Sequence, residues 1–413
     1  MNQRILPELL SPAGDRERLE AAVRFGADAV YLAGKQFGMR AAPGNFDPDA
    51  LKEAVRYCHE RNVLVYLTCN TVPTNEEVGR LPEFLKESAA AGIDALIVAD
   101  IGVLELAKRF APDIDVHIST QAGIMNYHTA NELHRMGASR VVLARELSLS
   151  DIRVIRDKTP SELEIEAFVH GAMCVSFSGR CLLSNYFLGR DANRGECAQP
   201  CRWGYYLMEE KRPGMYFPIE EDERGSYILN AKDMCMIEHI DKLCEAGITS
   251  MKIEGRAKSS YYVATITNAY RQAIDQYGRD PAHFKLEDWI LEETRKVSFR
   301  QYSTGFYFGR PEDGQFYENG GYVRGYEVIG VVEGCRDGRI LCEQRNKFCA
   351  GDTVEILQPG KKPMSMTVQA LYNGEGERID AAPHPQMKFS MPVSEPVSPG
   401  AIIRRAKLEQ GAK

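Results

Sequence analysis

The sequence predicts an α/β protein: a TIM-type (β/α) barrel with a Cys-rich insertion after strand seven and a C-terminal small all-β barrel domain. Three observations support this prediction. Apolar segments alternate with amphipathic helical stretches over most of the chain, cysteines crowd into one stretch near its middle, and short strands with turn signals fill its last part. The predicted boundaries are 1–282 for the barrel, about 170–226 for the insertion, 283–321 for a linker and 322–413 for the small barrel.

Eight short segments rich in Val, Ile and Leu are predicted to form the barrel strands, because parallel strands buried on both faces are apolar throughout. They are Glu8–Leu10, Ala29–Ala33, Val63–Asn70, Ala95–Ala99, Asp115–Ser119, Arg140–Ala144, Leu163–Val169 and Ser250–Ile253. Eight strand–helix units in this length favour a closed barrel over the alternative, an open doubly wound sheet.

Helical stretches lie between these strands, with helices predicted over 47–61, 76–91, 148–157, 236–246 and 259–277. Glycine takes the left-handed conformation at little cost, so it often follows the end of a helix. It occupies that place before four of the strands, at Gly26, Gly92, Gly137 and Gly247.

The chain beyond residue 322 is predicted to form the small β-barrel, because short strands alternate there with turn dipeptides such as Asp337-Gly338. The predicted strands are Tyr326–Val332, Arg339–Glu343, Thr353–Leu357, Met366–Ala370, Met387–Met391 and Ala401–Arg405. Small β-barrels often bind RNA or position a substrate.

The composition limits the classes of function. A chain of 413 residues with 44% hydrophobic and 26% charged residues is typical of a soluble globular protein and not of a disordered one. Its 58 acidic and 51 basic side chains create no global basic field, so nucleic acid would have to bind at a local patch. Without an apolar run long enough for a bilayer or a signal-peptide pattern, we expect a cytoplasmic protein with no membrane contact and no disulfides.

The cysteines are the most informative residues. Four of the eleven lie in the predicted insertion with the spacing Cys-x6-Cys-x15-Cys-x3-Cys: Cys174, Cys181, Cys197 and Cys201. Four thiols in one loop system favour an iron–sulfur site, because a 4Fe-4S cluster takes four thiolates. Zinc is an alternative metal, although the usual Cys-x2-Cys pairs are absent, and plain packing of buried thiols is a third interpretation.

The segment around the first two of these cysteines resembles the signature of the collagenase-like peptidase family of unassigned catalytic type. The matching residues are Glu166, Phe168, Gly171, Ala172, Cys174, Gly179, Cys181 and Ser184. Further matches occur at Glu8–Gly14, Gly26–Tyr31, Asn230–Asp233 and Lys252–Arg256. The resemblance therefore covers most of the chain, and within the family it is greatest to a branch implicated in tRNA hydroxylation.

This resemblance implies prephenate-dependent 5-hydroxylation of the wobble uridine of tRNA, with prephenate as substrate or precursor. It implies a 4Fe-4S cluster bound by Cys174, Cys181 and Cys197, with Cys201 or, alternatively, Cys235 as the fourth ligand. The implied partners are tRNA and a small anionic metabolite. A protein partner or a homo-oligomer stays open.

Other candidate residues follow the predicted strands at the barrel end that usually carries an active site. Arginines suit a dianion such as prephenate, because a guanidinium can bind a carboxylate through two hydrogen bonds. The candidates for substrate binding are Arg40, Asn70, Gln121, Arg145, Arg180 and Arg256, and those for catalysis are His170, Glu166 and Glu254. Aromatic and basic residues also alternate in 201–206 and 300–310, where unpaired RNA bases could stack.

Two other classes of function remain as alternatives. A peptidase could use Cys174 as a nucleophile activated by His170, four residues earlier. The sequence has neither the Gly-x-Ser-x-Gly nor the His-Glu-x-x-His motif of common hydrolases. A scaffold ordered by zinc could instead bind RNA without catalysis, and its metal content would distinguish it from an iron–sulfur enzyme.

Overall fold

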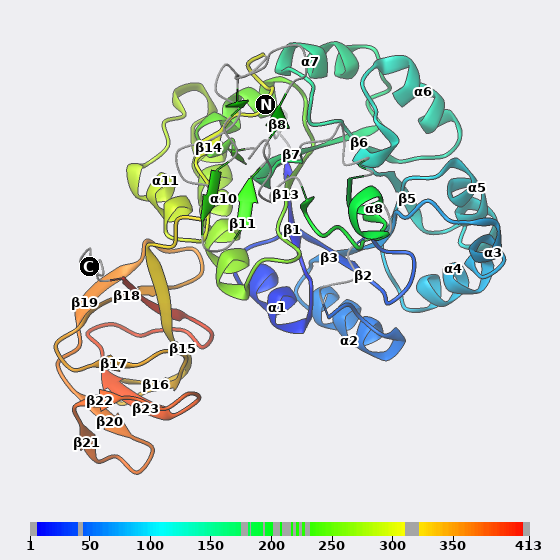
Figure 1. Cartoon of the computed structure of the whole chain (residues 1–413). Helices are drawn as coiled ribbons and strands as arrows, with labels where there is room; N and C mark the ends of the chain where they lie inside the picture. The colour runs from blue at the N-terminus through cyan, green and yellow to red at the C-terminus, as the bar shows by residue number, and fades with distance from the viewer. Residues whose placement is uncertain are drawn as a thin grey trace.

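The structure is a computed structural model that describes residues 6–39, 44–174, 181, 183–192, 195–200, 232–309 and 322–407, with four short strands between 207 and 227. Figure 1 shows a barrel surrounded by helices and, beside it, a separate β domain built from the C-terminal residues. Within the described residues, no helix combines the length and the apolar character needed to cross a membrane.

Eight parallel strands form the barrel. They are β1 (Glu8–Pro12), β2 (Ala29–Ala33), β3 (Leu64–Cys69), β4 (Ala95–Val98), β5 (Asp115–Ile118), β6 (Arg140–Val142), β7 (Glu164–Ala172) and β13 (Ser250–Ile253). The pairing runs from β1 to β7 in sequence order, and β13 pairs with both β1 and β7, so the ring closes. This closure confirms the predicted TIM-type barrel over the open sheet.

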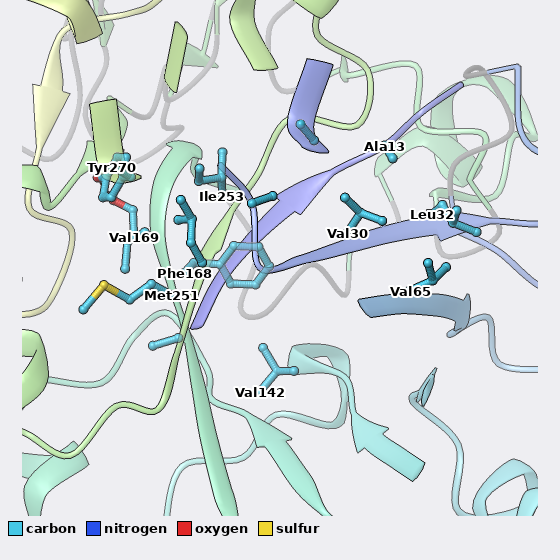
Figure 2. Close-up of a cluster of buried hydrophobic side chains, with 14 of the residues drawn as sticks. Ala13, Val30, Leu32, Val65, Val142, Phe168, Val169, Met251, Ile253 and Tyr270 are labelled. Atoms are coloured by element: carbon cyan, nitrogen blue, oxygen red, sulfur yellow. The ribbon is translucent and has the colours of Figure 1, made fainter. Parts of the chain in front are cut away.

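The barrel strands are buried on both faces, which explains their apolar sequences. Leu10, Tyr31 and Tyr66 belong to one buried cluster, whereas the chain neighbours Leu9 and Val30 belong to another, larger cluster. Because successive strand residues point to opposite faces, the first cluster lies inside the barrel and most of the second lies between strands and helices. Figure 2 shows part of the second cluster, which includes Val30.

The surrounding helices are α1 (Arg16–Arg24), α2 (Pro48–His59), α3 (Asn75–Val78), α4 (Leu81–Ala90), α5 (Ile101–Phe110), α6 (Tyr127–Arg135), α7 (Leu149–Asp157), α9 (Ile240–Glu245) and α10 (Ser260–Arg279). Several begin at a capping side chain that accepts a hydrogen bond from the first turn, such as Asp47 before α2 and Ser148 before α7. The four glycines predicted to follow helices all have positive φ. One helix is predicted over 76–91, but the structure has two, because α3 ends at Val78 and α4 begins at Leu81 with Pro82 in its first turn.

Further elements extend the barrel beyond its eight strands. Strand β12 (Asp233–Cys235) pairs antiparallel with β7, and β14 (Tyr302–Ser303) pairs with β12. Helix α11 (Asp288–Arg295) packs against α10. Part of the segment predicted as a linker thus packs with the barrel. Strands of two or three residues are too short to produce a recognisable sequence pattern.

The C-terminal domain is an antiparallel half-barrel whose sheet order is β19-β18-β24-β15-β16-β23-β20-β21. Its strands are β15 (Tyr326–Arg336), β16 (Arg339–Gln344), β18 (Thr353–Leu357), β19 (Met364–Thr367), β20 (Leu371–Asn373), β21 (Arg378–Ile379), β23 (Lys388–Pro392) and β24 (Ile402–Ala406). Residues such as Ile329, Ile340 and Phe389 form a separate core for this domain. Each of the six predicted strands overlaps a strand of this domain, but the one predicted over Met366–Ala370 shares only Met366 and Thr367 with β19.

A buried ion network joins the two domains. Arg404 on β24 donates to Glu293 on α11 at 2.6 Å and to Glu355 on β18 at 2.7 Å. Lys296, which follows α11, lies 2.9 Å from Glu355 and 3.1 Å from Glu293. Burial alone would raise the pKa of Glu355, but Arg404 and Lys296 outweigh burial and hold that pKa below its ordinary value. These charges fix the half-barrel against the outer layer of the first domain.

Replacing Arg404 with alanine should lower the free energy of unfolding by about 3 kcal/mol, because Glu293 would stay buried without its nearest cation. Arg405 is the matched control on the same strand, and its partners Glu327 and Asp352 are partly exposed. Arg405→Ala should cost about 1 kcal/mol or less. Urea unfolding of both variants measures the difference, and equal losses would contradict a network that depends on burial.

Candidate functional site

Three predicted site residues meet at the C-terminal ends of the barrel strands, which we call the mouth. Arg145 follows β6, and Glu254 and Arg256 follow β13. Arg145 Nη1 donates to the backbone oxygen of Ala172 at 2.9 Å, and its Nη2 lies 3.9 Å from Glu254 Oε2. Arg256 is buried and its Nη1 donates to Thr68 Oγ1 at 3.0 Å. This part of the mouth thus contains two guanidinium groups and at least one carboxylate.

Arg145 keeps a buried donor available for a ligand. Its guanidinium lies 4.0 Å from the centre of the Phe168 ring, which supports it from within the barrel. Its Nε is buried and has no hydrogen-bond partner among the described residues. A buried N–H without a partner costs free energy, so an anion that accepts a hydrogen bond from Nε would bind favourably.

Two glycines let the backbone close tightly around this site. A Cβ at Gly171, which has a φ of +109°, would collide with the carbonyl oxygen of Glu254. A Cβ at Gly14 would collide in the same way with the carbonyl oxygen of Arg256. Both glycines belong to the motifs noted in the sequence, so these motifs have a structural explanation: they allow the loop after β13 to pack against β7 and against the end of β1.

Of the other four predicted binding residues, two lie within the described residues and two lie outside them. Asn70, at the end of β3, accepts a hydrogen bond from the backbone of Met39 at 3.3 Å. Gln121 lies in a short 3-10 turn after β5 and is buried. Both follow strand ends on the same side of the barrel as Arg145. Arg40 and Arg180 lie outside the described residues.

Glu166 lies deep in the barrel and away from the mouth. Its carboxylate accepts from Lys252 Nζ at 2.7 Å and from Arg140 Nη1 at 3.0 Å. Arg140 also binds Glu8, the first residue of β1, at 2.6 Å. Burial alone would raise the pKa of Glu166, but Lys252 and Arg140 outweigh burial and hold it below the ordinary value. Both oxygens of Glu166 therefore bind cations that hold neighbouring strands together. Because Glu166 also lies away from the mouth, its position gives no support to the predicted catalytic role.

His170 also faces away from the mouth. A register shift between β7 and β13 aligns it with Ile253, and its ring lies 5.3 to 6.0 Å from those of Tyr262, Tyr270 and Tyr302. Burial, with a smaller contribution from a nearby lysine, lowers the pKa of His170 to about 3. His170 is thus a neutral residue of a tyrosine-lined compartment, and its predicted role as a base has no support from its position.

Cys235 shares this compartment. It lies opposite His170 in the antiparallel pairing of β12 and β7. Burial raises the pKa of Cys235 to about 11, so its thiol is protonated at neutral pH. Cys174 lies four residues beyond His170, which corresponds to about 13 Å of extended chain. Cys235 thus lies across from β7, within four residues of the start of the insertion.

The cysteines of the insertion have a different environment. All described cysteines are free thiols, and Cys174 and Cys197 are exposed. Cys181 Sγ accepts from the backbone N–H of Leu183 at 3.5 Å, and Cys197 Sγ accepts from that of Gln199 at 3.4 Å. Amide donors of this kind stabilise thiolates and tune iron–sulfur clusters.

A buried serine links the two segments that carry Cys181 and Cys197. Ser184 Oγ accepts from the backbone N–H of Ala198 at 2.8 Å, which ties α8 (Leu183–Leu188) to the second segment. The amide donors suit sulfur atoms that act as thiolate ligands. No three His, Cys, Asp or Glu side chains of the described residues are grouped closely enough to hold a metal ion, and Cys201 lies outside those residues.

Three residues of the site were not anticipated from the sequence. Thr68 binds Arg256, and Tyr307 donates through its hydroxyl to the Phe168 backbone oxygen at 2.5 Å. Lys252 neutralises Glu166. A signal existed only for Lys252, because a lysine in one apolar parallel strand and a glutamate in another indicate a buried ion pair.

The buried, neutral His170 should make the protein sensitive to acid. An unfolded histidine takes up a proton below pH 6.5, whereas folded His170 does so only near pH 3, so stability falls as pH decreases between these values. In His170→Phe, the slope of unfolding free energy against pH should fall by up to about 1.4 kcal/mol per pH unit. Urea unfolding between pH 7 and pH 4.5 measures it. The exposed His283→Phe is the control, and an unchanged slope in His170→Phe would contradict the burial.

Comparison with known proteins identifies relatives along nearly the whole chain. Residues 14–316 match Peptidase family U32, and residues 324–404 match the Peptidase family U32 C-terminal domain. The chain is 37% identical over 405 residues to tRNA hydroxylation protein P1 of Bacillus subtilis strain 168, which covers 97% of this chain and 95% of that protein. It is 35% identical over 436 residues to tRNA hydroxylation protein P of Escherichia coli strain K12, covering 94% of each.

A third relative carries a different description. The chain is 44% identical over 307 residues to an uncharacterized protease of Methanocaldococcus jannaschii, covering 74% of each chain. The motifs around Gly14 and Gly171, whose glycines close the mouth, lie within the matched 14–316 region. Because these matches cover most of its length, the chain belongs to peptidase family U32.

Proposed function

We propose that this protein hydroxylates tRNA, and that its reaction is the prephenate-dependent 5-hydroxylation of the wobble uridine. Relatives that match over nearly their full length are named tRNA hydroxylation proteins, which supports the RNA substrate. The reaction replaces the C5 hydrogen of the base with a hydroxyl group, so it is an oxidation. A reaction of this kind needs a redox group and a site for the small co-substrate beside the base.

The observation that carries the proposal is the closeness of the arginine site to the origin of the cysteine-rich insertion. Arg145 Nη1 binds the backbone oxygen of Ala172, and Cys174 is only two residues further along the chain. An anion held at the mouth would therefore lie beside the segment that carries the thiols. Loops at this end of a TIM barrel hold the active site in essentially every characterised enzyme of the fold.

For the redox group we propose a 4Fe-4S cluster bound by Cys174, Cys181, Cys197 and Cys201. The amide donors to two of these sulfurs support it. Cys235 is the alternative fourth ligand, because Cys201 lies much nearer to Cys197 along the chain. When bound, the cluster would supply electron transfer or oxygen-atom activation.

For the co-substrate we propose that Arg145 and Arg256 bind the carboxylates of prephenate. Arg145 Nε is buried and unsatisfied, and a carboxylate is the acceptor that a guanidinium fork fits best. Glu254 lies 3.9 Å from Arg145 and would orient its guanidinium and accept a proton from bound substrate. The half-barrel, fixed to the barrel by its ion network, would help to dock the RNA.

The geometry favours this function over the peptidase alternative. A cysteine peptidase needs an imidazole in contact with the nucleophilic thiol. His170, the histidine predicted for that role, is enclosed by tyrosines and neutral. Its partner across the strand is Cys235, whose pKa is raised, so this pair does not form an activated thiolate.

Deleting the gene should remove 5-hydroxyuridine and its derivatives from tRNA, as measured by mass spectrometry of tRNA nucleosides. The wild-type gene should restore them, but Cys197→Ala should not, and the variant should lose iron on anaerobic purification. Cys235→Ala is the matched control and should keep both the modification and about four iron atoms per chain. Restoration by Cys197→Ala, or an iron-free wild-type protein that is active, would contradict the proposal.

Arg145→Gln should raise the prephenate concentration needed for half-maximal hydroxylation by about tenfold or more, because a charge-assisted hydrogen bond is lost. Arg153→Gln is the control, since Arg153 binds only a backbone oxygen of Glu245 at the surface among the described residues. Thermal unfolding checks that both variants fold. An unchanged concentration dependence in folded Arg145→Gln would exclude Arg145 from the anion site.

A further inference from the structure

The loop after β14 holds an aromatic ring outside the protein. Phe308 is 57% exposed, although its neighbour Tyr307 is buried. Large apolar side chains exposed to this degree are common as isolated, mobile residues and need no explanation in themselves. Phe308 differs because the backbone on both sides of it is fixed.

Several hydrogen bonds fix this loop. The Tyr307 hydroxyl donates to the Phe168 backbone oxygen, and the Tyr307 backbone oxygen accepts from Leu149 N at 2.9 Å. Gly309 N donates to the Phe306 oxygen at 2.9 Å, and Gly309 has a φ of +105°. The turn therefore presents Phe308 in one direction and reduces the entropy that its ring would lose on binding.

The loop lies at the mouth, next to the start of the insertion. Leu149 is the first residue of α7, which follows β6, and Phe168 lies beneath Arg145. A Cβ at Gly305 would come within 2.8 Å of Met234 and 3.8 Å of Met173, the residue before Cys174. The fixed turn thus borders the end of β7, where the cysteine-rich insertion begins.

A second ring supports Phe308 from the side. The His239 and Phe308 centroids lie 4.8 Å apart at an interplanar angle of 67°, an edge-to-face contact, and Phe308 still keeps 57% of its surface exposed. Unpaired bases stack on such rings, and stacking on one aromatic side chain is a substantial part of single-stranded RNA binding.

We propose that Phe308, supported by His239, is a stacking platform for an unpaired base of the RNA substrate at the mouth. This inference rests on the proposed function, because it takes the substrate to be tRNA. The base stacked here would be the target or its neighbour in the anticodon loop. Stacking at this position would hold the anticodon loop over the arginine site. Basic residues elsewhere would bind its phosphates.

The test is binding of an anticodon stem-loop RNA with a wobble uridine to the anaerobically purified full chain, measured across a range of salt concentrations. Phe308→Ala should weaken binding by about fivefold or more, whereas Phe308→Trp should bind as well as wild type. The slope of log affinity against log salt should not change, because no phosphate contact is lost. Leu64→Ala is the control: it is 42% exposed, at the opposite end of the barrel.

The two proposals fail in different ways. If the wild-type protein binds no tRNA or stem-loop at any salt concentration, the proposed function fails and the platform fails with it. If wild type binds but Phe308→Ala binds equally well, only the platform is overturned. A shallower salt slope in Phe308→Ala would also overturn it, because that result would indicate a disturbed phosphate site in place of lost stacking.

Discussion

The fold depends on a carboxylate buried at the seam where the barrel closes. Glu166 on β7 lies between Lys252 on β13 and Arg140 on β6, and Arg140 reaches on to Glu8 at the start of β1. Four strands are thus joined by charges of which Arg140, Glu166 and Lys252 are buried and Glu8 is partly buried. Removing one member would leave its partners uncompensated, which costs far more than losing a surface ion pair. The network therefore fixes which strands meet at the seam and how they align.

The candidate site is built on these same strands. Arg145 follows β6, Cys174 follows β7, and Arg256 follows β13, so a fixed seam places all three at one mouth. The two sides of β7 then have distinct roles. Phe168 supports the mouth, whereas His170 lines the tyrosine compartment with Cys235. The compartment holds the neutral His170 and the protonated thiol of Cys235. Cys181 and Cys197, whose sulfur atoms accept hydrogen bonds from backbone amides, belong to the insertion that begins at the mouth.

The sequence predicted the barrel well, because strands buried on both faces and glycines after helices leave clear patterns. It did not predict which way individual side chains point. The apolar pattern places Glu166 on the right strand and His170 at its end. The register shift beside Ile253 turns His170 outward, and a bulge of this kind leaves no signal in one sequence. The contact of Thr68 with Arg256 joins residues 188 positions apart, which no local pattern can indicate.

The central claim is that the arginine site and the cysteine-rich insertion form a single site. The most direct test is the electron paramagnetic resonance spectrum of the reduced, anaerobically purified protein, recorded with and without prephenate. Prephenate should alter the cluster signal of wild type and leave that of Arg145→Gln unchanged at the same concentration. If calorimetry shows that prephenate binds to wild type while the cluster signal stays the same, the arginine site and the insertion are separate sites.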